Sequence, residues 1–163
     1  MIYAEHYGDA SSWMQGDQWD TVMNYYAFME PLTWFMTGME KHSDSYKAEY
    51  YRNGEFFEGC MSHYMTAFHM PSLMTAMNQL SNHDHSRFLT RTNQFAGRLA
   101  TSGAKAAEEN VKKHVLKMAV AFQMTWIGAP TLYYGDEAGL CGFTDPDNRR
   151  TYPWGKEDFE LIE

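Results

Sequence analysis

The chain has 163 residues, 44% of them hydrophobic, which is enough to bury one sizeable core. Its 13 basic and 21 acidic residues give a formal net charge of −8, and the basic residues are scattered. This pattern argues against nucleic acid and against an anionic membrane as partners. We therefore expect one domain, or part of one.

Cysteines and terminal signals exclude further classes of protein. Cys60 and Cys141 lie far apart and form no CxxC pair, so we expect neither a disulfide framework nor a zinc site from them. No apolar run reaches the roughly 18 residues that a membrane-spanning helix needs. Residues 1–7 lack the basic start and apolar stretch of a signal peptide, which favours a cytoplasmic location.

In chain order, short apolar runs of strand length alternate with helical patterns. Strands are predicted over 2–5 and 21–25. A helix is predicted over 28–39 because apolar residues recur there at helical spacing, namely Phe28, Leu32, Phe35, Met36 and Met39. The polar segment 41–53 is predicted to be a loop.

The second half of the chain repeats this alternation. A second helix is predicted over 57–68, a strand over 74–80 and a loop over 93–104. A third helix is predicted over 111–126, and a last strand over 131–134.

Start and stop signals flank the third helix. Glu108 and Glu109 precede it, where negative charge suits a helix start, and Gly128 and Pro130 follow it. Strand and helix thus alternate in an α/β pattern that implies a parallel sheet. Four strands are half of those in a (β/α)8 barrel, so we predict a partial TIM barrel; an open doubly wound sheet is the alternative.

Polar clusters follow three of the predicted strands. Glu5 ends the first strand, Asn82-His83-Asp84 follows the third, and Asp136 and Glu137 follow the fourth. Ligand sites in parallel α/β folds lie at the carboxyl ends of the strands, so we expect these groups near one another. A surface turn is the plain alternative for Asn82-His83-Asp84, and we expect Asp136-Glu137 to brace its loop by hydrogen bonds.

Three blocks of sequence stand out together, namely AEHYGDA (4–10), LSNHD (80–84) and GAPTLYYGDE (128–137). In this order they resemble the α-amylase family of glycoside hydrolases, and specifically its neopullulanase, cyclomaltodextrinase and maltogenic amylase branch. The first two blocks are similar to the acid region of the family's fifth barrel strand and to the block of its seventh strand. The third is similar to the eighth-strand region, and the run 145–150 is typical of the branch.

The resemblance implies roles for individual residues. Glu5 would be the general acid/base, and Asp84 the carboxylate that distorts and stabilises the bound sugar. His83 would contact a sugar hydroxyl in the same subsite, with Asn82 as a further binding residue. Two more residues would lie near the sugars on the non-reducing side, unless they only form ion pairs in a solvated turn; they are Asp145 and Arg149.

By the same resemblance, residues 1–163 form the C-terminal half of a catalytic barrel, approximately strands five to eight with their helices. The full-length parent would hydrolyse α-glucosidic bonds in maltodextrin, cyclodextrin or pullulan by a retaining mechanism, without cofactor or metal. The family's nucleophilic aspartate follows the fourth strand, upstream of these residues, so we expect the isolated chain to be inactive. The family also usually has Trp where this chain has Tyr7.

Two other functions are consistent with parts of the sequence. His83 and His85 have the spacing of two metal ligands in a metal-dependent hydrolase. Alternatively, the chain could bind α-glucans without catalysis. Half a barrel would leave strand edges unpaired, and such edges favour association with another chain.

Overall fold

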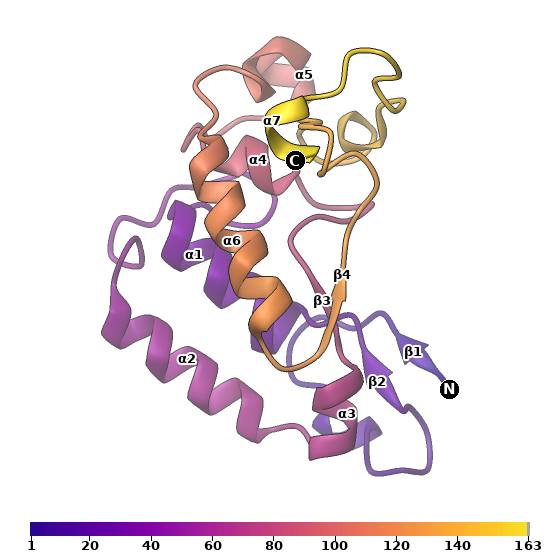
Figure 1. The fold of residues 1–163 in the computed structure, drawn as a ribbon. Helices are drawn as coiled ribbons and strands as arrows, with labels where there is room; N and C mark the ends of the chain where they lie inside the picture. Colours follow the sequence, from indigo (N-terminus) through magenta and orange to yellow (C-terminus); the bar gives the residue numbers. More distant parts are fainter. Residues whose placement is uncertain (163) are drawn as a thin grey trace.

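The computed structural model describes residues 1–162, which form a mixture of helices and short parallel strands (Figure 1). The mixed α/β composition predicted from the sequence is confirmed. The strands are β1 (Tyr3–Ala4), β2 (Thr21–Val22), β3 (Met77–Gln79) and β4 (Ala129–Thr131).

The four strands lie side by side in chain order. β1 pairs with β2, and β3 pairs with β4, both in parallel. A parallel bridge between Met23 and Met77 joins the two pairs. β1 and β4 are therefore the outer strands, and within residues 1–162 each pairs on one side only.

Buried amide side chains connect neighbouring strands. Asn24 Nδ2 donates to Asn78 Oδ1 at 2.7 Å, and Asn78 Nδ2 donates to the carbonyl of Ile127 at 2.8 Å. A Cβ at Gly128 would lie 2.4 Å from the Asn78 side chain, and its φ is +126°. Glycine is therefore required where the chain enters β4.

Three longer helices lie on one side of the strands in Figure 1, and none of the helices in residues 1–162 covers the opposite side. They are α1 (Glu30–Thr37), α2 (Gly54–Thr66) and α6 (Lys113–Thr125). The main core lies between α1, α6 and the strands, and it includes Phe28, Leu32, Phe88, Leu116 and Ala119. Burial of these apolar side chains fixes the helices against the strands.

Each predicted helix is present with altered bounds. The first is longer toward its start, because a π-helical turn over Tyr25–Met29 runs directly into α1. Asn24 caps that turn by accepting from the amide of Ala27 at 3.1 Å. The second helix begins three residues earlier than expected, where the Asn53 side chain accepts from the amide of Phe56.

The start signal proposed for the third helix was wrong. α6 begins at Lys113 without an acidic residue in its first turn. Glu108 and Glu109 fall in a preceding turn, and the amide of Lys112 instead donates to Thr92 Oγ1 at 2.7 Å. The hydrogen bond from Lys112 to Thr92 thus takes the place of a capping side chain from the residues just before the helix.

Three strand predictions need correction. The strand predicted over 21–25 ends at Val22, because Tyr25 already begins the π-helical turn that Asn24 caps. Residues 74 and 75 end α3 (Met70–Thr75), so β3 begins only at Met77.

The last strand begins two residues earlier and ends three residues earlier than predicted, and it includes Pro130. Proline is tolerated there because the neighbouring Ala129 donates its amide on the β3 side, to the carbonyl of Ala76 at 2.8 Å. The missing N–H of Pro130 therefore costs no bond to β3.

Three short helices lie in segments predicted to be irregular or not assigned. They are α4 (Phe88–Arg91), α5 (Leu99–Ser102) and α7 (Phe159–Ile162). α5 corrects the prediction of a loop over 93–104, whereas the segment 41–53 is irregular as expected. Cys60 and Cys141 are both buried free thiols. None of the helices in residues 1–162 has the length and apolar character needed to cross a membrane.

Candidate active site

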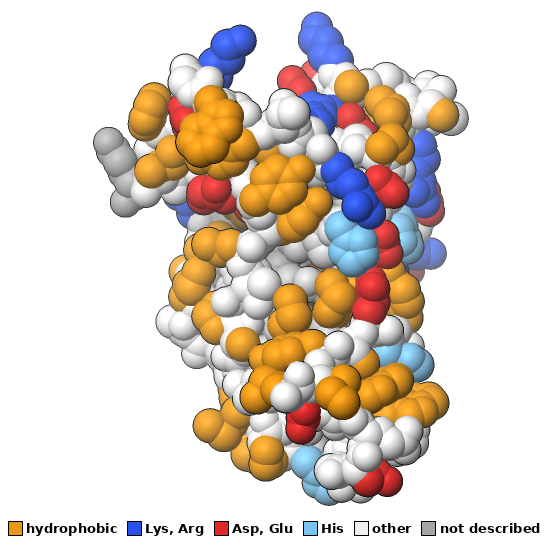
Figure 2. Space-filling model, turned by 90° about the vertical axis from the view of Figure 1, so that its right-hand side faces the viewer, with side chains coloured by type: hydrophobic (Ala, Val, Ile, Leu, Met, Phe, Trp, Pro, Cys, Tyr) orange, Lys and Arg blue, Asp and Glu red, His pale blue; other side chains and the backbone are white. Residues whose placement is uncertain are grey.

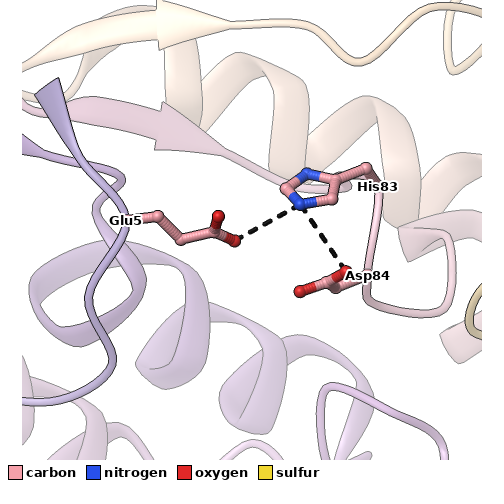
Figure 3. A group of neighbouring side chains, drawn as sticks. All are labelled: Glu5, His83 and Asp84. Carbon is pink, nitrogen blue, oxygen red and sulfur yellow. Dashed lines mark ion pairs between the residues drawn. The ribbon is translucent and has the colours of Figure 1, made fainter.

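The turns that follow β1 and β3 bring two carboxylates and an imidazole together. Glu5 comes directly after β1, and His83 and Asp84 lie in the turn after β3. His83 Nε2 lies 3.4 Å from Glu5 Oε1 and 3.5 Å from Asp84 Oδ1 (Figure 3). Residues almost eighty positions apart thus form one cluster at the carboxyl end of the strands.

This cluster is accessible to a ligand. The side chains of Glu5, His83 and Asp84 are 41%, 38% and 40% exposed. Figure 2 shows a histidine side chain beside acidic and basic side chains at the surface, next to an area of apolar and uncharged groups. Hydrogen-bonding groups for sugar hydroxyls are therefore available at this face.

Asn82 lies below the cluster and is buried. Its Oδ1 accepts from the amides of Asp84 and His85, at 3.0 and 2.9 Å. Its Nδ2 faces the hydroxyl of Tyr25 at 3.0 Å and His85 Nδ1 at 3.1 Å. The side chain of Asn82 therefore shapes the turn that presents His83 and Asp84.

His85 does not join His83 as a metal ligand. The side chain is fully buried and packs edge-on against the ring of Tyr25. Burial, followed by the nearby charge of Arg91, lowers the pKa of His85 to about 2, so the ring stays neutral. Within residues 1–162, the groups of three potential ligands are Glu5-His83-Asp84 and Glu40-His42-Asp44, and neither includes His85.

The ligand atoms of the second group already have partners in the protein. His42 Nδ1 lies 2.7 Å from Glu40 Oε1, and Asp44 forms an ion pair with Arg98. Burial raises the pKa of Glu40, but hydrogen bonds from His42 outweigh it and bring the pKa to about 2. Glu40 therefore acts as an ionised brace for the loop 38–46.

Two tyrosines contact the carboxylates of the cluster. Tyr7 Oη donates to Asp84 Oδ2 at 3.0 Å, and Tyr25 Oη donates to Glu5 Oε1 at 3.1 Å. Their rings are stacked, with centroids 4.7 Å apart and an interplanar angle of 14°. The carboxylates of Glu5 and Asp84 are therefore linked through tyrosine side chains as well as through His83.

Asp145 and Arg149 form an ion pair beside Asp84. Arg149 Nε lies 2.9 Å from Asp145 Oδ1 and also donates to the carbonyl of His83 at 3.1 Å. Arg149 Nη2 lies 4.0 Å from Asp84 Oδ1. The ion pair expected of a solvated turn is therefore present, and it lies next to the cluster.

Asp136 lies behind the cluster in a buried ion pair. Arg87 Nη1 contacts Asp136 Oδ1 at 2.9 Å, and both side chains are buried. Burial raises the pKa of Asp136, although the adjacent Arg87 opposes this rise. The prediction that Asp136 braces its loop is confirmed.

Sequence reasoning missed Tyr25 and Arg87 as supports of the site. Tyr25 was assigned to the end of a strand, although its hydroxyl reaches Glu5. Arg87 belongs to the polar run after the third strand, but its guanidinium donates to the carbonyls of Tyr134 and Asn148. The burial of Arg87 could not be predicted from the sequence, because an arginine in a polar run is normally expected at the surface.

Comparison with known proteins identifies the family. The family model "Alpha amylase, catalytic domain" matches residues 1–160. The chain belongs to the alpha-amylase family. The model describes the catalytic domain of this family, which implies a (β/α)8 barrel fold.

Curated relatives of this alpha-amylase family chain include enzymes of the branch that the sequence resembles. An amylopullulanase from Thermoanaerobacterium thermosulfurigenes is 35% identical over 98% of the chain, which spans 8% of that enzyme. Neopullulanase 2 from Thermoactinomyces vulgaris is 34% identical over 97% of the chain. The chain spans only 22% of that relative.

Solved structures show the same fold. A debranching enzyme from Nostoc punctiforme matches 99% of the chain with a TM-score of 0.75 and 27% identity. The cyclic α-maltosyl-(1→6)-maltose hydrolase from Arthrobacter globiformis, solved in complex with that sugar, matches 99% of the chain with a TM-score of 0.70 and 26% identity. The chain spans 30% of each of these structures.

Proposed function

We propose that residues 1–163 are the C-terminal half of an α-amylase-family barrel, approximately strands five to eight, in a larger enzyme that hydrolyses α-glucosidic bonds. The order β1-β2-β3-β4, all parallel, is the order that consecutive barrel strands require. The small share of each relative that the chain spans supports the same assignment. The observation that carries the function is the convergence of Glu5, His83 and Asp84 at the carboxyl end of these strands.

Glu5 is the general acid/base of the proposed reaction. It protonates the glycosidic oxygen as the bond breaks, and it later takes a proton from the attacking water. Within residues 1–162, hydrogen bonds reach its Oε1 from Tyr25, whereas none reaches Oε2. Oε2 is therefore the oxygen left for the leaving group.

Asp84 and His83 hold the sugar whose bond is cleaved. Tyr7 occupies Asp84 Oδ2, so Oδ1, which faces His83 and Arg149, is the atom placed to accept from sugar hydroxyls. His83 adds a ring nitrogen next to both carboxylates. Asp145 and Arg149 extend this polar surface toward the neighbouring sugar, and Asn82 fixes the turn.

The proposed mechanism is retaining, and its nucleophile lies outside this chain. A retaining pair requires a second carboxylate about 5 to 5.5 Å from the acid. Oxygens of Glu5 and Asp84 lie within 4.8 Å of each other, but Asp84 is engaged by Tyr7 and adjoins Arg149. The resemblance assigns nucleophilic attack to an aspartate after the fourth barrel strand. Maltodextrin, cyclodextrin and pullulan are the proposed substrates, as the names of the relatives suggest.

Glu5→Gln in the full-length protein tests the acid role. We expect hydrolysis of maltotriose to fall about a thousandfold, because the leaving sugar then departs without a proton. The first turnover of α-maltosyl fluoride should be largely retained, since fluoride leaves without protonation. A rapid-quench assay of fluoride release measures this difference, and Glu58→Gln on the exposed surface of α2 is the control.

If Glu5→Gln lost the same factor of activity on maltotriose and on α-maltosyl fluoride, the acid role would be contradicted and Glu5 would have a structural role. NMR analysis of the first anomer released tests the stereochemistry. A β-anomer would rule out retention. Sequencing upstream of Met1 tests the assignment as a barrel half, which requires an in-frame strand that ends in an aspartate.

A further inference from the structure

Two tyrosines each donate a hydrogen bond to one carboxylate of the site, Tyr7 to Asp84 and Tyr25 to Glu5. Asn82 Oδ1 accepts from two backbone amides, so Asn82 Nδ2 must be the atom that faces Tyr25. An amide nitrogen only donates. Tyr25 Oη therefore accepts from Asn82 and directs its own proton to Glu5 Oε1.

The ring of Tyr7 is held by neighbours from three parts of the chain. Tyr25 stacks against it at 4.7 Å, and the edge of His85 approaches at a centroid distance of 5.8 Å. The ammonium of Lys41 lies 5.1 Å from the ring centroid and also pairs with Glu30. Although Tyr7 is 46% exposed, these contacts restrict its ring, and its hydroxyl points at Asp84.

Both phenols remain hydrogen-bond donors over the neutral pH range. Burial, followed by the hydrogen bond to Asp84, raises the pKa of Tyr7 to about 12. Burial, followed by the charge of Glu5, also raises the pKa of Tyr25. Neither hydroxyl therefore adds a negative charge beside the carboxylates.

We propose that Tyr7 and Tyr25, the tyrosine pair, are positioning residues that hold Asp84 and Glu5 at a fixed separation for the reaction. This inference rests on the proposed function of the two carboxylates. Each phenol holds one oxygen of one carboxylate, and the stacked rings join the two phenols into one unit. The Trp that the family usually has at position 7 carries an indole N–H in place of a hydroxyl, so a phenol contact to Asp84 requires Tyr at this position.

Tyr7→Phe removes the hydroxyl and keeps the ring, so it separates the effects of these two groups. In the full-length protein we expect kcat for maltotriose to fall about tenfold, because Asp84 loses a donor to its charged form. KM should change less than about twofold, since the ring that supports the site remains. A variant that only loosened the fold would raise KM and lower the melting temperature.

A second stacked pair in the same molecule provides a matched control. Tyr26 stacks on Tyr64 of α2 with ring centroids 3.9 Å apart, away from the carboxylates. Tyr26→Phe removes one hydroxyl from a stacked tyrosine and should leave kcat unchanged. Unchanged kcat in Tyr7→Phe, or an equal loss in Tyr26→Phe, would overturn the proposal.

A titration of the chain itself tests the contact without any activity. With [13Cζ]tyrosine labelling, the Tyr7 resonance, assigned by its absence in Tyr7→Phe, should titrate with a pKa of about 12. Asp84→Asn should move that pKa toward 10. A pKa near 10 in the unsubstituted chain, or a raised pKa that Asp84→Asn leaves unchanged, would overturn the proposal, because burial alone also raises the pKa of Tyr7. If the full-length protein hydrolyses no α-glucan, the proposed function fails, and this titration still decides whether the tyrosine contact exists.

Discussion

His85 is a buried histidine that must remain neutral for the chain to stay folded. Its pKa is about 2 in the folded chain and close to 6.5 when exposed. Above pH 6.5 neither state binds the proton. Below it only the unfolded chain does, so the free energy of unfolding falls as the pH falls from 6.5 toward 2.

We therefore predict that His85→Gln reduces the pH dependence of stability. Between pH 7 and about 4.5, the free energy of unfolding of the unsubstituted chain should fall by roughly 2.5 kcal/mol through His85 alone. Urea titrations at both pH values measure the difference between the two proteins. His114→Gln, at an exposed position on α6, should leave the dependence unchanged. An equally steep fall in His85→Gln would contradict the prediction.

The sequence was sufficient to predict that Glu5, His83 and Asp84 lie together, and insufficient to predict what holds them in place. Glu5, His83 and Asp84 follow strands and stand in contiguous motifs, so strand ends alone place them together. Their supports depend on side-chain geometry. The contact between Tyr7 and Asp84 joins residues 77 positions apart, and nothing in the local pattern distinguishes Tyr7 from an ordinary aromatic.

Arg87 connects the turn after β3 with the segment after β4. Its guanidinium donates to Asp136, to the carbonyl of Tyr134 and to the carbonyl of Asn148. Asn148 in turn donates to the carbonyls of Asn82 and His85. The position of the turn that carries His83 and Asp84 thus depends on an arginine that never reaches the surface.

Arg87→Met should destabilise the chain by about 3 to 5 kcal/mol, because it leaves Asp136 buried without its partner. Arg98→Met, which breaks an exposed ion pair with Asp44, should cost about 1 kcal/mol or less. Urea unfolding compares the two variants. Adding Asp136→Asn to Arg87→Met should recover part of the lost stability. No recovery would show that the unpaired charge is not the cause.

Element positions were predictable where one face of a segment is apolar, and less so where tertiary contacts decide the ends. The periodic pattern of α6 predicted a helix, but its start is set by a tertiary contact, because the helix begins directly after Lys112, whose amide donates to Thr92 Oγ1. The apolar run 74–80 is divided between α3 and β3. A short apolar run fits the buried end of a helix as well as a strand, so the spacing of its apolar residues cannot distinguish these two structures.

At the scale of the molecule, the outer strands β1 and β4 have backbone groups available for pairing. Such edges favour association with a further chain. We predict that residues 1–163 expressed alone release no maltose from cyclodextrin and self-associate as concentration rises. Light scattering after size exclusion measures the mass.

Tyr3→Lys on β1 should reduce this association, because charge on an outer strand opposes edge pairing. Met118→Lys, which adds the same charge on the exposed side of α6, is the control. A chain that stays monomeric at every concentration, or equal effects of both lysines, would contradict the role of the edges. The parallel order of the strands was predictable from their alternation with helices, whereas their very short length was not.

The hydroxyl contact between Tyr7 and Asp84 also bears on how this site can change during evolution. Where a homologue has Trp at position 7, the donor on that side chain is an indole N–H, which sits at a different place on the ring from the phenol hydroxyl. The effect on fitness of exchanging the residue at position 7 will therefore depend on the residues around position 84, which is epistasis between two strand ends. Transplanting the homologue's Trp alone would remove the hydroxyl that meets Asp84 without the matching changes around it.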